Sequence, residues 1–350
     1  METRGGRSGL RPDANDHRHA LRVAVGLAIP GIALLIAGRP ELMVYAAFGS
    51  FAGMYGRTDS GAARLRHQLE AGCLLTVGVT IGVTLAAAMV PGWVLIVVGA
   101  TFAAAGSMLA DLLRLRPVGP FYFLFAMGAT ATVSPNPVPP LVAIGICAGS
   151  AALAVVVGHI GVPLGGRCSS PIRRLPRGAT VHAVRYAIAV GSAGTLGMSL
   201  GFDHANWAMA AAAVPLGAVD LGRRDGEMRL VALRALHRIV GTIVGLGVTA
   251  AVLAVGLGPA ALASLMMVLL FPTELFMTRH YAIAIGFFTP LVMLMTELAG
   301  PSDPVALLSA RGVDSLIGVV MGVVVVVVVP GRRSGRTSTF RLGAGTAARI

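Results

Sequence analysis

Charged residues are scarce in this chain, and none of them is a lysine. Only 12% of the 350 residues are charged, whereas 55% are hydrophobic and the mean hydropathy is +0.80. Soluble domains carry about a quarter charged residues, so a soluble globular protein is excluded. No polar stretch as long as a soluble domain separates the apolar segments. The sequence predicts an all-α fold, a polytopic membrane protein.

Residues that hold metals or carry out catalysis are also few. Cys73, Cys147 and Cys168 show no CxxC spacing and no histidine or acidic partner in a metal-site pattern, which supports neither a disulfide framework nor a metal site. No HExxH, P-loop, paired acidic motif or intramembrane carboxylate dyad is present. We therefore expect no cofactor, no metal and no enzymatic activity.

The formal charge of +13 comes from 28 basic residues against 15 acidic ones. Such an excess can indicate nucleic-acid binding, but these arginines occupy short breaks between apolar segments and lack interleaved aromatics for base stacking. We interpret them as topology signals and as contacts to anionic lipids, and we expect no nucleic acid as a partner.

Twelve apolar segments divide the chain, with boundaries uncertain by a few residues. They lie near 20–38, 41–56, 69–90, 93–113, 120–134, 141–163, 181–201, 206–220, 238–257, 259–277, 280–298 and 305–329. The segments 41–56, 120–134 and 206–220 are short for a hydrocarbon layer of about 30 Å, so whether they cross it fully is undecided. Short, interrupted spans at matching positions are typical of substrate sites in transporters.

Arginines gather in alternate connections between these segments. One side carries Arg57, Arg64, Arg66, Arg114, Arg116, Arg167, Arg173, Arg174, Arg177, Arg223, Arg224, Arg229, Arg234 and Arg279, and the other only Arg39 and Arg311. The positive-inside rule then predicts that both termini are cytoplasmic. We interpret 1–18 as a retained basic tail instead of a signal peptide.

The two halves of the chain resemble each other. "HALRVAVGLAIPG" from His19 recurs as "HAVRYAIAVGSAG" from His182. The sequence thus predicts two six-helix repeats, 19–163 and 181–330, joined by a cytoplasmic linker at 164–180 and followed by a basic tail at 331–350. An even number of spans per half predicts parallel repeats related by an axis along the membrane normal.

Glycines spaced four apart predict close helix packing in lipid. The pairs are Gly78 with Gly82, Gly145 with Gly149, Gly241 with Gly245, and Gly318 with Gly322. "GMSLG" from Gly197 fits the GxSxG pattern of serine hydrolases, but it lacks the strand–turn–helix context that such a nucleophile needs. We interpret it as small-residue packing at a span end, and the enzyme alternative requires Ser199 to face His159.

Charges at or near the span boundaries are the main functional signal. They are Arg22, Arg185, Glu70, Asp111, Asp220, Arg238, Glu274, Arg279, Glu297, Arg311 and Asp314. Arg22 and Arg185 occupy matching positions of the two repeats. They are either interfacial anchors, whose side chains reach the headgroups, or the lining of a vestibule that attracts anions.

Arg311 breaks the inside-positive pattern, and Asp314 follows it at a spacing that allows the two to pair. One interpretation is a salt bridge at the outer interface. The other is a pathway arginine that binds a carboxylate, with Asp314 tuning it or carrying protons. The first repeat has Ile144 and Cys147 at the aligned positions, so the fold does not require these charges.

Four motifs resemble the fusaric acid resistance (FUSC) family: "NWAMAAAAVPLG" from Asn206, "RALHRIVGTIVG" from Arg234, "RHYAIAIGFFTPL" from Arg279 and "ARGVDSLIGVVMG" from Ala310. The resemblance is clearest over 180–330. It implies an exporter of aromatic carboxylic acids in the bacterial inner membrane. A more distant resemblance, to plant aluminium-activated malate channels, implies an arginine-lined anion path, and the matching positions are Arg238, Arg279, Arg311 and Asp314.

We therefore expect a secondary, proton-coupled exporter whose two halves rock about a central site for a small organic anion. The expected binding residues are Arg311, Asp314, Arg238, Arg279, Arg22, Arg185, Trp207 and Tyr281, with Phe121 and Tyr122 as further aromatic contacts. Asp314 and Asp220 are the expected proton carriers. A passive organic-anion channel, a membrane-embedded enzyme and a structural subunit are the alternatives, and a homo-oligomer is left open.

Overall fold

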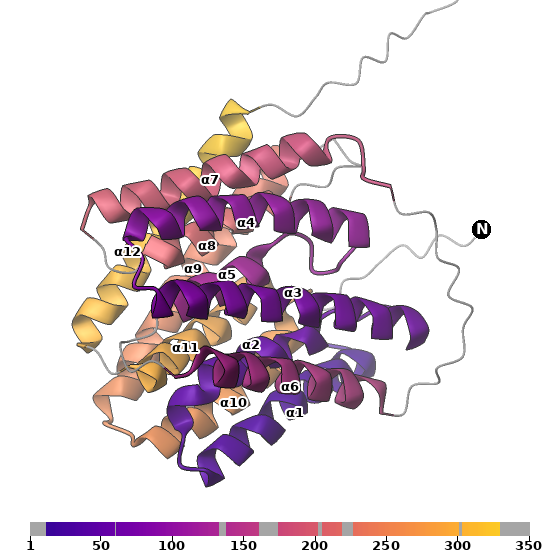
Figure 1. Ribbon diagram of the computed structural model, residues 1–350, viewed down its shortest axis with the longest axis vertical. Helices are drawn as coiled ribbons and strands as arrows, with labels where there is room; N and C mark the ends of the chain where they lie inside the picture. The colour runs from indigo at the N-terminus through magenta and orange to yellow at the C-terminus, as the bar shows by residue number, and fades with distance from the viewer. Residues whose placement is uncertain are drawn as a thin grey trace, which may run out of the picture.

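The computed structural model describes residues 12–59, 61–132, 138–160, 174–201, 205–218, 227–300 and 303–329. These residues form twelve α-helices and two 3-10 helices, and no strand (Figure 1). The first half contains α1 (Ala14–Ile36), η1 (Pro40–Leu42), α2 (Met43–Ser50), η2 (Phe51–Met54), α3 (Gly61–Ala87), α4 (Gly92–Leu113), α5 (Phe121–Ala131) and α6 (Pro140–His159). The second contains α7 (Ala179–Ser199), α8 (Ala205–Leu216), α9 (Glu227–Ala254), α10 (Pro259–Phe276), α11 (Tyr281–Ala299) and α12 (Pro304–Val328).

The expectation of an all-helical, polytopic membrane protein is confirmed. Within the described ranges, eight helices are long and apolar enough to cross a membrane, namely α1, α3, α4, α6, α9, α10, α11 and α12. Each of the twelve expected segments coincides with a helix or a group of helices. That all twelve cross the bilayer stays a prediction, because α5 and α8 have only 11 and 12 residues.

The expected span 41–56 is not one helix. It is divided into η1, the eight-residue α2 and η2. Pro40 stands at the start of η1, and the chain leaves the helical conformation at Tyr55, just after Gly53 and Met54. An eight-residue α-helix extends about 12 Å, which is less than half of the hydrocarbon layer.

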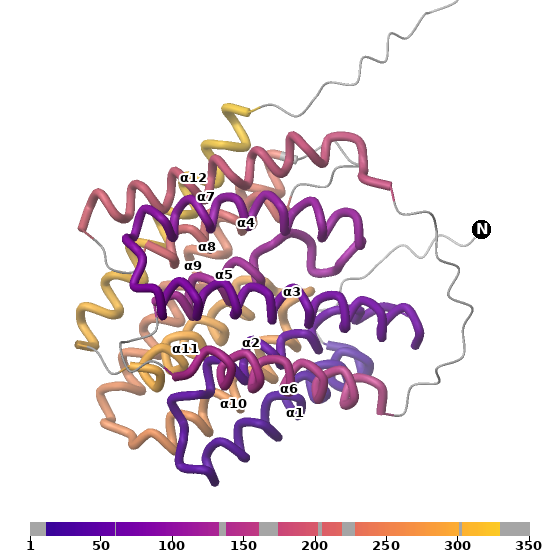
Figure 2. Tube along the Cα trace, viewed as in Figure 1, coloured from indigo at the N-terminus to yellow at the C-terminus, as the bar shows by residue number. Residues whose placement is uncertain are grey.

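The short helices lie in the interior. The long helices run side by side across Figures 1 and 2, while α2, α5 and α8 lie among them. Every residue of α2 is buried, and so is α8 from Asn206 to Leu216. The long helices present many large apolar side chains on their outer faces, as lipid contact requires.

The same packing partners recur in the two halves. α1 packs on α2 and α6 as α7 packs on α8 and α12, and α3 packs on α5 and α6 as α9 packs on α11 and α12. Between the halves, α4 packs on α7 as α10 packs on α1. Helices six positions apart in the chain therefore have corresponding neighbours.

Three of the four glycine pairs lie at close helix contacts. Gly78 and Gly82 face backbone oxygens of α5, Gly241 and Gly245 face those of α11, and a Cβ at Gly318 would overlap the carbonyl oxygen of Ala208 on α8. The prediction for Gly145 and Gly149 is wrong within the described residues, because a Cβ at either position would have none of their atoms within 4 Å. Glycine spacing alone does not reveal which face of a helix meets a neighbour.

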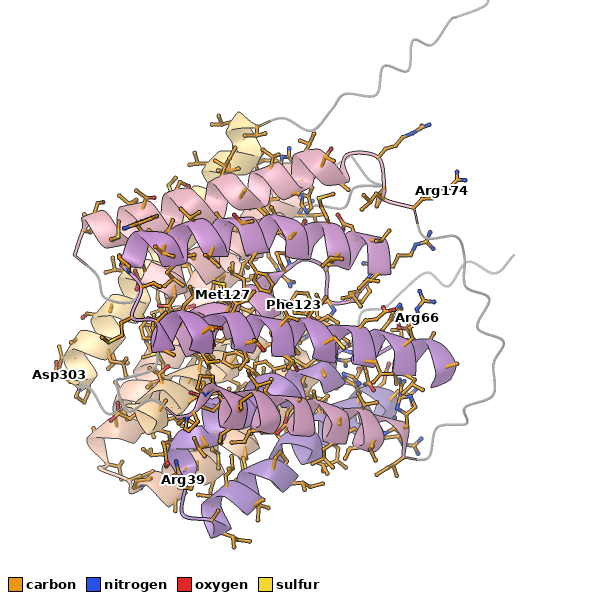
Figure 3. All side chains as sticks on the ribbon, viewed as in Figure 1. Arg39, Arg66, Phe123, Met127, Arg174 and Asp303 are labelled. Atoms are coloured by element: carbon orange, nitrogen blue, oxygen red, sulfur yellow. The ribbon has the colours of Figure 1, made fainter. Side chains whose placement is uncertain are left out.

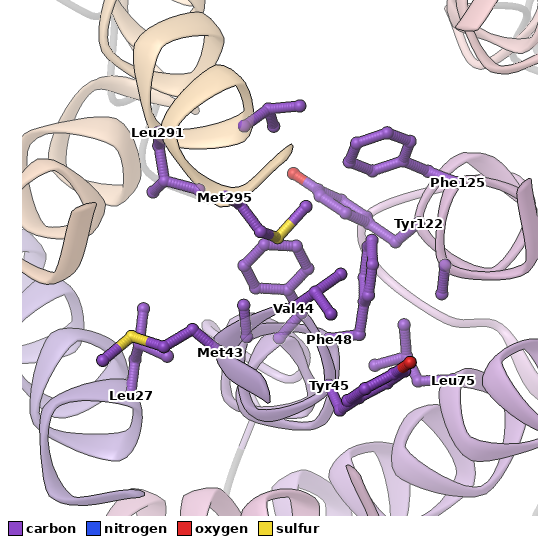
Figure 4. Close-up of a cluster of buried hydrophobic side chains, with 14 of the residues drawn as sticks. Leu27, Met43, Val44, Tyr45, Phe48, Leu75, Tyr122, Phe125, Leu291 and Met295 are labelled. Carbon is purple, nitrogen blue, oxygen red and sulfur yellow. The ribbon is translucent and has the colours of Figure 1, made fainter. Parts of the chain in front are cut away.

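An apolar core joins the two halves (Figure 4). Phe48 of α2, Tyr122 and Phe125 of α5, and Leu291 and Met295 of α11 meet there. Phe48 and Phe125 pack edge to face with centroids 5.3 Å apart, and Tyr122 packs edge to face on Phe51 at 5.7 Å. Phe288 of α11 packs edge to face on Tyr122 and Phe125, so aromatic side chains from both halves pack together in this core.

Arginines taken from the two expected sets lie at opposite ends of the helices. In Figure 3, Arg66 and Arg174 lie at one end of the bundle, whereas Arg39 and Asp303 lie at the other. This arrangement agrees with the alternation of charge on which the predicted topology rests.

Candidate functional site

A cavity of about 550 Å³ lies between the two halves at the arginine-rich end. The first half contributes the chain after η2, the segment 116–118 and the start of α5. The second half contributes the end of α8, the first turns of α9 and α11, and the end of α10. The volume falls within the range of small-molecule sites, roughly 300–1,000 Å³.

The cavity runs from exposed connections to a buried floor. Thr58, Arg116 and Thr278 are exposed at one end. At the other end, Ile285 and Phe288 are each 1% exposed, and the aromatic core lies behind them. The cavity is therefore open towards the arginine-rich loops and closed by aromatic side chains on its other side.

Two arginines of α9 line the cavity against aromatic rings. The guanidinium carbon of Arg234 lies 3.6 Å from the centroid of Tyr281, and that of Arg238 lies 5.2 Å from the centroid of Phe121. Arg238 is 1% exposed, and its Nε and Nη1 atoms have no hydrogen-bond partner among the described residues. A buried guanidinium is costly unless an anion or acceptor offsets its desolvation, so Arg238 is suited to bind a carboxylate in this cavity.

Arg311 and Asp314 of α12 are buried at 1% and 0% exposure. The alternative of a salt bridge between them is not seen, since neither carboxylate oxygen of Asp314 has a hydrogen-bond partner in the described part of the chain, although the charges of the two residues act on each other. Asp314 instead faces α7 at Gly197. The guanidinium of Arg311 lies 5.2 Å from the ring centroid of Trp207 on α8, and the charge of Arg238 acts on it. The positive charges of Arg238 and Arg311 therefore act on each other, and Arg311 also lies over the ring of Trp207.

Arg22 and Arg185 lie outside the cavity lining. Nη2 of Arg22 donates to the carbonyl oxygen of Ile160 at 3.0 Å, and Nε of Arg185 donates to that of Val329 at 2.8 Å. These carbonyls belong to the C-cap residues of α6 and α12, which lack intrahelical partners and attract positive charge. Both arginines therefore tie the first helix of a half to the end of its last helix.

Arg279 also lies outside the cavity lining, in an ion-pair network at the start of α1. Its Nε donates to Asp16 at 2.7 Å, and its Nη2 donates to Asp13 at 2.6 Å. The hydrogen bonds that Arg279 donates to these carboxylates raise its pKa. Arg57 of the cavity wall donates to the same Asp16 at 2.7 Å. The network holds α1 against the connection between α10 and α11.

The residues of the enzyme alternative are not brought together. Ser199 donates to the carbonyl of Leu196 at 2.8 Å, and Nδ1 of His159 lies 2.8 Å from that of Val155. No group of three or more histidine, cysteine or acidic side chains in the described residues is arranged to hold a metal. Asp220, an expected proton carrier, lies outside the described residues.

Four charged residues of the cavity were not among the expected binding residues: Arg57, Arg116, Arg234 and Glu274. The three arginines stand in the predicted inner connections, where they were interpreted as topology signals. Glu274 was recognised only as a boundary charge. Sequence gave no sign that these positions converge, because they come from connections and helices far apart in the chain.

Comparison with known proteins finds a similar membrane protein and a family that matches part of the chain. The chain is 28% identical over 144 residues to the uncharacterized membrane protein YvaC of Bacillus subtilis (strain 168), a match over 41% of this chain and 22% of that relative. The matched region thus spans about a fifth of the relative's length, and no solved structure matches the chain. Residues 189–325 match the family described as fusaric acid resistance protein-like. The resemblance to the FUSC family inferred from the motifs is therefore confirmed, over this second half of the chain.

Proposed function

We propose that this protein is a secondary transporter of the bacterial inner membrane that exports aromatic carboxylic acids or similar organic anions, coupled to protons. Both termini face the cytoplasm, and the cavity opens to that side. The two halves act as parallel repeats that move about the cavity. The match to the FUSC family over 189–325 supports the transporter class, and the corresponding packing partners of the two halves support the repeat.

One observation carries the choice of substrate, the buried guanidinium of Arg238 at an aromatic cavity wall. Two of its nitrogens have no partner in the described residues. A carboxylate would accept hydrogen bonds from them, while the aromatic ring of the substrate would pack on Phe121, Tyr122 or Phe288. Arg234 on Tyr281 adds positive charge near the mouth.

Arg311 and Trp207 offer the next position along the path. An anion leaving Arg238 would meet the buried guanidinium of Arg311, whose Nε and Nη1 also have no hydrogen-bond partner in the described segments. Asp314 lies on the same helix and would oppose the anion's charge, so that binding there is weak enough to allow release. Two successive arginines make a path in which neither site traps the anion.

A passive organic-anion channel is the second candidate, because an arginine-lined path serves it equally well. The aromatic floor formed around Phe288 favours the transporter, since it separates the cavity from the other side of the molecule. A channel would need that floor to open without the two halves moving.

Efflux from cells tests the proposal. Cells that express the protein are loaded with labelled benzoate and related aromatic acids, and efflux is followed with and without an uncoupler. We expect efflux that the uncoupler suppresses. Arg238→Gln should reduce it at least tenfold, because a hydrogen bond to a charged group is worth about 1.5–3 kcal/mol.

The matched control is Arg177→Gln, which removes an exposed arginine ahead of α7 and should leave efflux unchanged. Efflux that persists with the uncoupler would favour the channel. No efflux of any aromatic acid from cells with membrane-inserted protein would contradict the proposed substrate class.

A further inference from the structure

A histidine and a glutamate face each other at the interface of α1 and α10. Nε2 of His19 lies 3.4 Å from Oε2 of Glu274, and the two side chains are only 8% and 4% exposed. The contact lies within ion-pairing distance, but its geometry does not make a hydrogen bond, and Nε2 has no other partner among the described residues. A buried carboxyl beside a histidine can change its protonation when nearby charge changes.

Glu274 belongs to the wall of the cavity. The negative charge of its carboxylate acts on the hydroxyl groups of Tyr55, after η2, and Tyr122 of α5. Arg234 of α9 and Tyr281 of α11 line the same cavity wall. Arg57 donates through Nη1 to the backbone carbonyl of Glu274 at 3.0 Å, which leaves the carboxyl unbound by this arginine. η1 meets α10 elsewhere, and there Glu41 is paired with Arg39. Among the described residues, the carboxyl thus meets His19 and acts on two phenols, while the charged groups that share the cavity wall with it are Arg57, Arg116, Arg234 and Arg238.

The other interface between the halves provides an internal comparison. His182 of α7 and Asp111 of α4 each stand 163 positions from His19 and Glu274 respectively, and α4 packs on α7. His182 packs edge to face on Tyr186 at 4.8 Å instead of meeting an acid at ion-pairing distance. Asp111 is absent from the cavity lining. Of these two interfaces, as far as the described residues show, the one between α1 and α10 combines a histidine–carboxyl contact with access to the cavity.

We propose that Glu274, supported by His19, is the proton-binding site through which anion binding in the cavity is linked to protons. This inference rests on the proposed function and replaces Asp314 and Asp220 as the coupling group. A carboxylate at Glu274 repels an anion in the same cavity and competes for the positive field of Arg234. Protonation removes both effects, so the anion and the proton each favour the binding of the other.

The test measures anion binding and proton uptake together on the purified full chain in detergent. Benzoate is titrated calorimetrically in two buffers of different ionisation enthalpy, at pH values where benzoate stays ionised. For the wild type we expect proton uptake on binding and an affinity that falls with rising pH, by up to about tenfold per pH unit for one linked proton. Glu274→Gln should bind benzoate with no proton uptake and no pH dependence.

Two further variants separate the site from a general effect of buried acids. Asp111→Asn removes the corresponding carboxyl at the other interface and should keep the proton uptake of the wild type. Glu274→Asp restores a titratable group and should restore part of the uptake. Proton uptake that persists in Glu274→Gln, or that disappears in Asp111→Asn, would overturn the inference.

The failures of the two proposals are distinguishable. A wild type that binds no aromatic acid contradicts the proposed function, whereas a wild type that binds without proton uptake contradicts only this inference. A folded Glu274→Gln variant that binds nothing would also overturn it, because Glu274 would then be needed for binding itself.

If Glu274→Gln does not fold, the wild type is treated with dicyclohexylcarbodiimide, which reacts with protonated carboxyls, and the labelled peptides are identified by mass spectrometry. Labelling of Glu274 that declines as pH rises is expected. No labelling of Glu274 at any pH would overturn the inference.

Discussion

At the scale of single residues, the cost of burying Arg238, Arg311 and Asp314 is the main evidence for a binding path. Arg311 is 1% exposed and Asp314 is fully buried, yet in the described part of the molecule no hydrogen bond joins them. A protein that needed only stability would gain by replacing such groups with apolar ones. The presence of these buried charges is therefore best explained by a role in binding anions.

Arg311→Gln should leave the protein inserted and able to bind benzoate at Arg238, but slow its turnover more than tenfold. The reason is that the second positive position on the path is lost while the first is retained. Binding by calorimetry and transport in proteoliposomes measure the two effects separately. Loss of binding with unchanged turnover would contradict the order of the two sites.

The sequence identified Arg238, Arg311, Asp314, Trp207 and Tyr281 as candidates. Arg238 and Tyr281 line the cavity, whereas the other three are absent from its lining, and Arg311 is connected to it through the charge of Arg238. The sequence did not separate these candidates from Arg22, Arg185 and Arg279, because an arginine at a helix boundary has the same pattern whether it binds a substrate or a helix end. The distinction depends on partners distant in the chain, such as Ile160 for Arg22 and Asp16 for Arg279. Those partners become known only when the helices are packed.

At the scale of helices, close backbone contacts position the path. α12 packs on α8 through Gly318 and Gly322, and this contact holds Arg311 beside Trp207. The four-residue spacing predicted this contact, whereas the same spacing in α6 led to a wrong prediction. Periodicity locates a smooth helix face but does not identify the helix that covers it.

Gly318→Leu should destabilise the protein and disturb the site, because its side chain would overlap the carbonyl of Ala208. Overpacking of this kind costs about 1–3 kcal/mol. The control is Gly247→Leu in α9, where a Cβ meets no atom within 4 Å. Thermal unfolding in detergent compares the two, and equal midpoints would contradict the close α8–α12 contact.

At the scale of the whole molecule, the two halves have corresponding helix contacts. A rocking movement of one half against the other would open the cavity first to one side of the membrane and then to the other. The halves meet where α4 packs on α7 and where α1 packs on α10. If the halves rock, these interfaces must change during each cycle. Contacts within a half should stay fixed.

A disulfide across the halves should therefore stop transport. A Cβ at Gly191 of α7 would lie 3.7 Å from that of Ala100 on α4, close to the typical disulfide separation of about 3.8 Å. With the native cysteines replaced, Gly191→Cys with Ala100→Cys should lose transport on oxidation and regain it on reduction.

The matched control joins α1 to α6 within the first half. A Cβ at Gly26 would lie 3.5 Å from that of Ala154, so Gly26→Cys with Ala154→Cys should form a disulfide and keep transport. If the cross-half disulfide forms fully and transport continues, rocking at this interface is refuted and the channel is favoured.

The central claim is that the cavity carries an aromatic carboxylate by binding it at Arg238. Counterflow tests this most directly: purified protein is reconstituted into vesicles preloaded with unlabelled benzoate, and uptake of external labelled benzoate is followed. The account predicts transient accumulation by the wild type, at least a tenfold reduction in Arg238→Gln and no change in Arg177→Gln. Equal accumulation by the wild type and Arg238→Gln, or none by the wild type across the panel of aromatic acids, would contradict it.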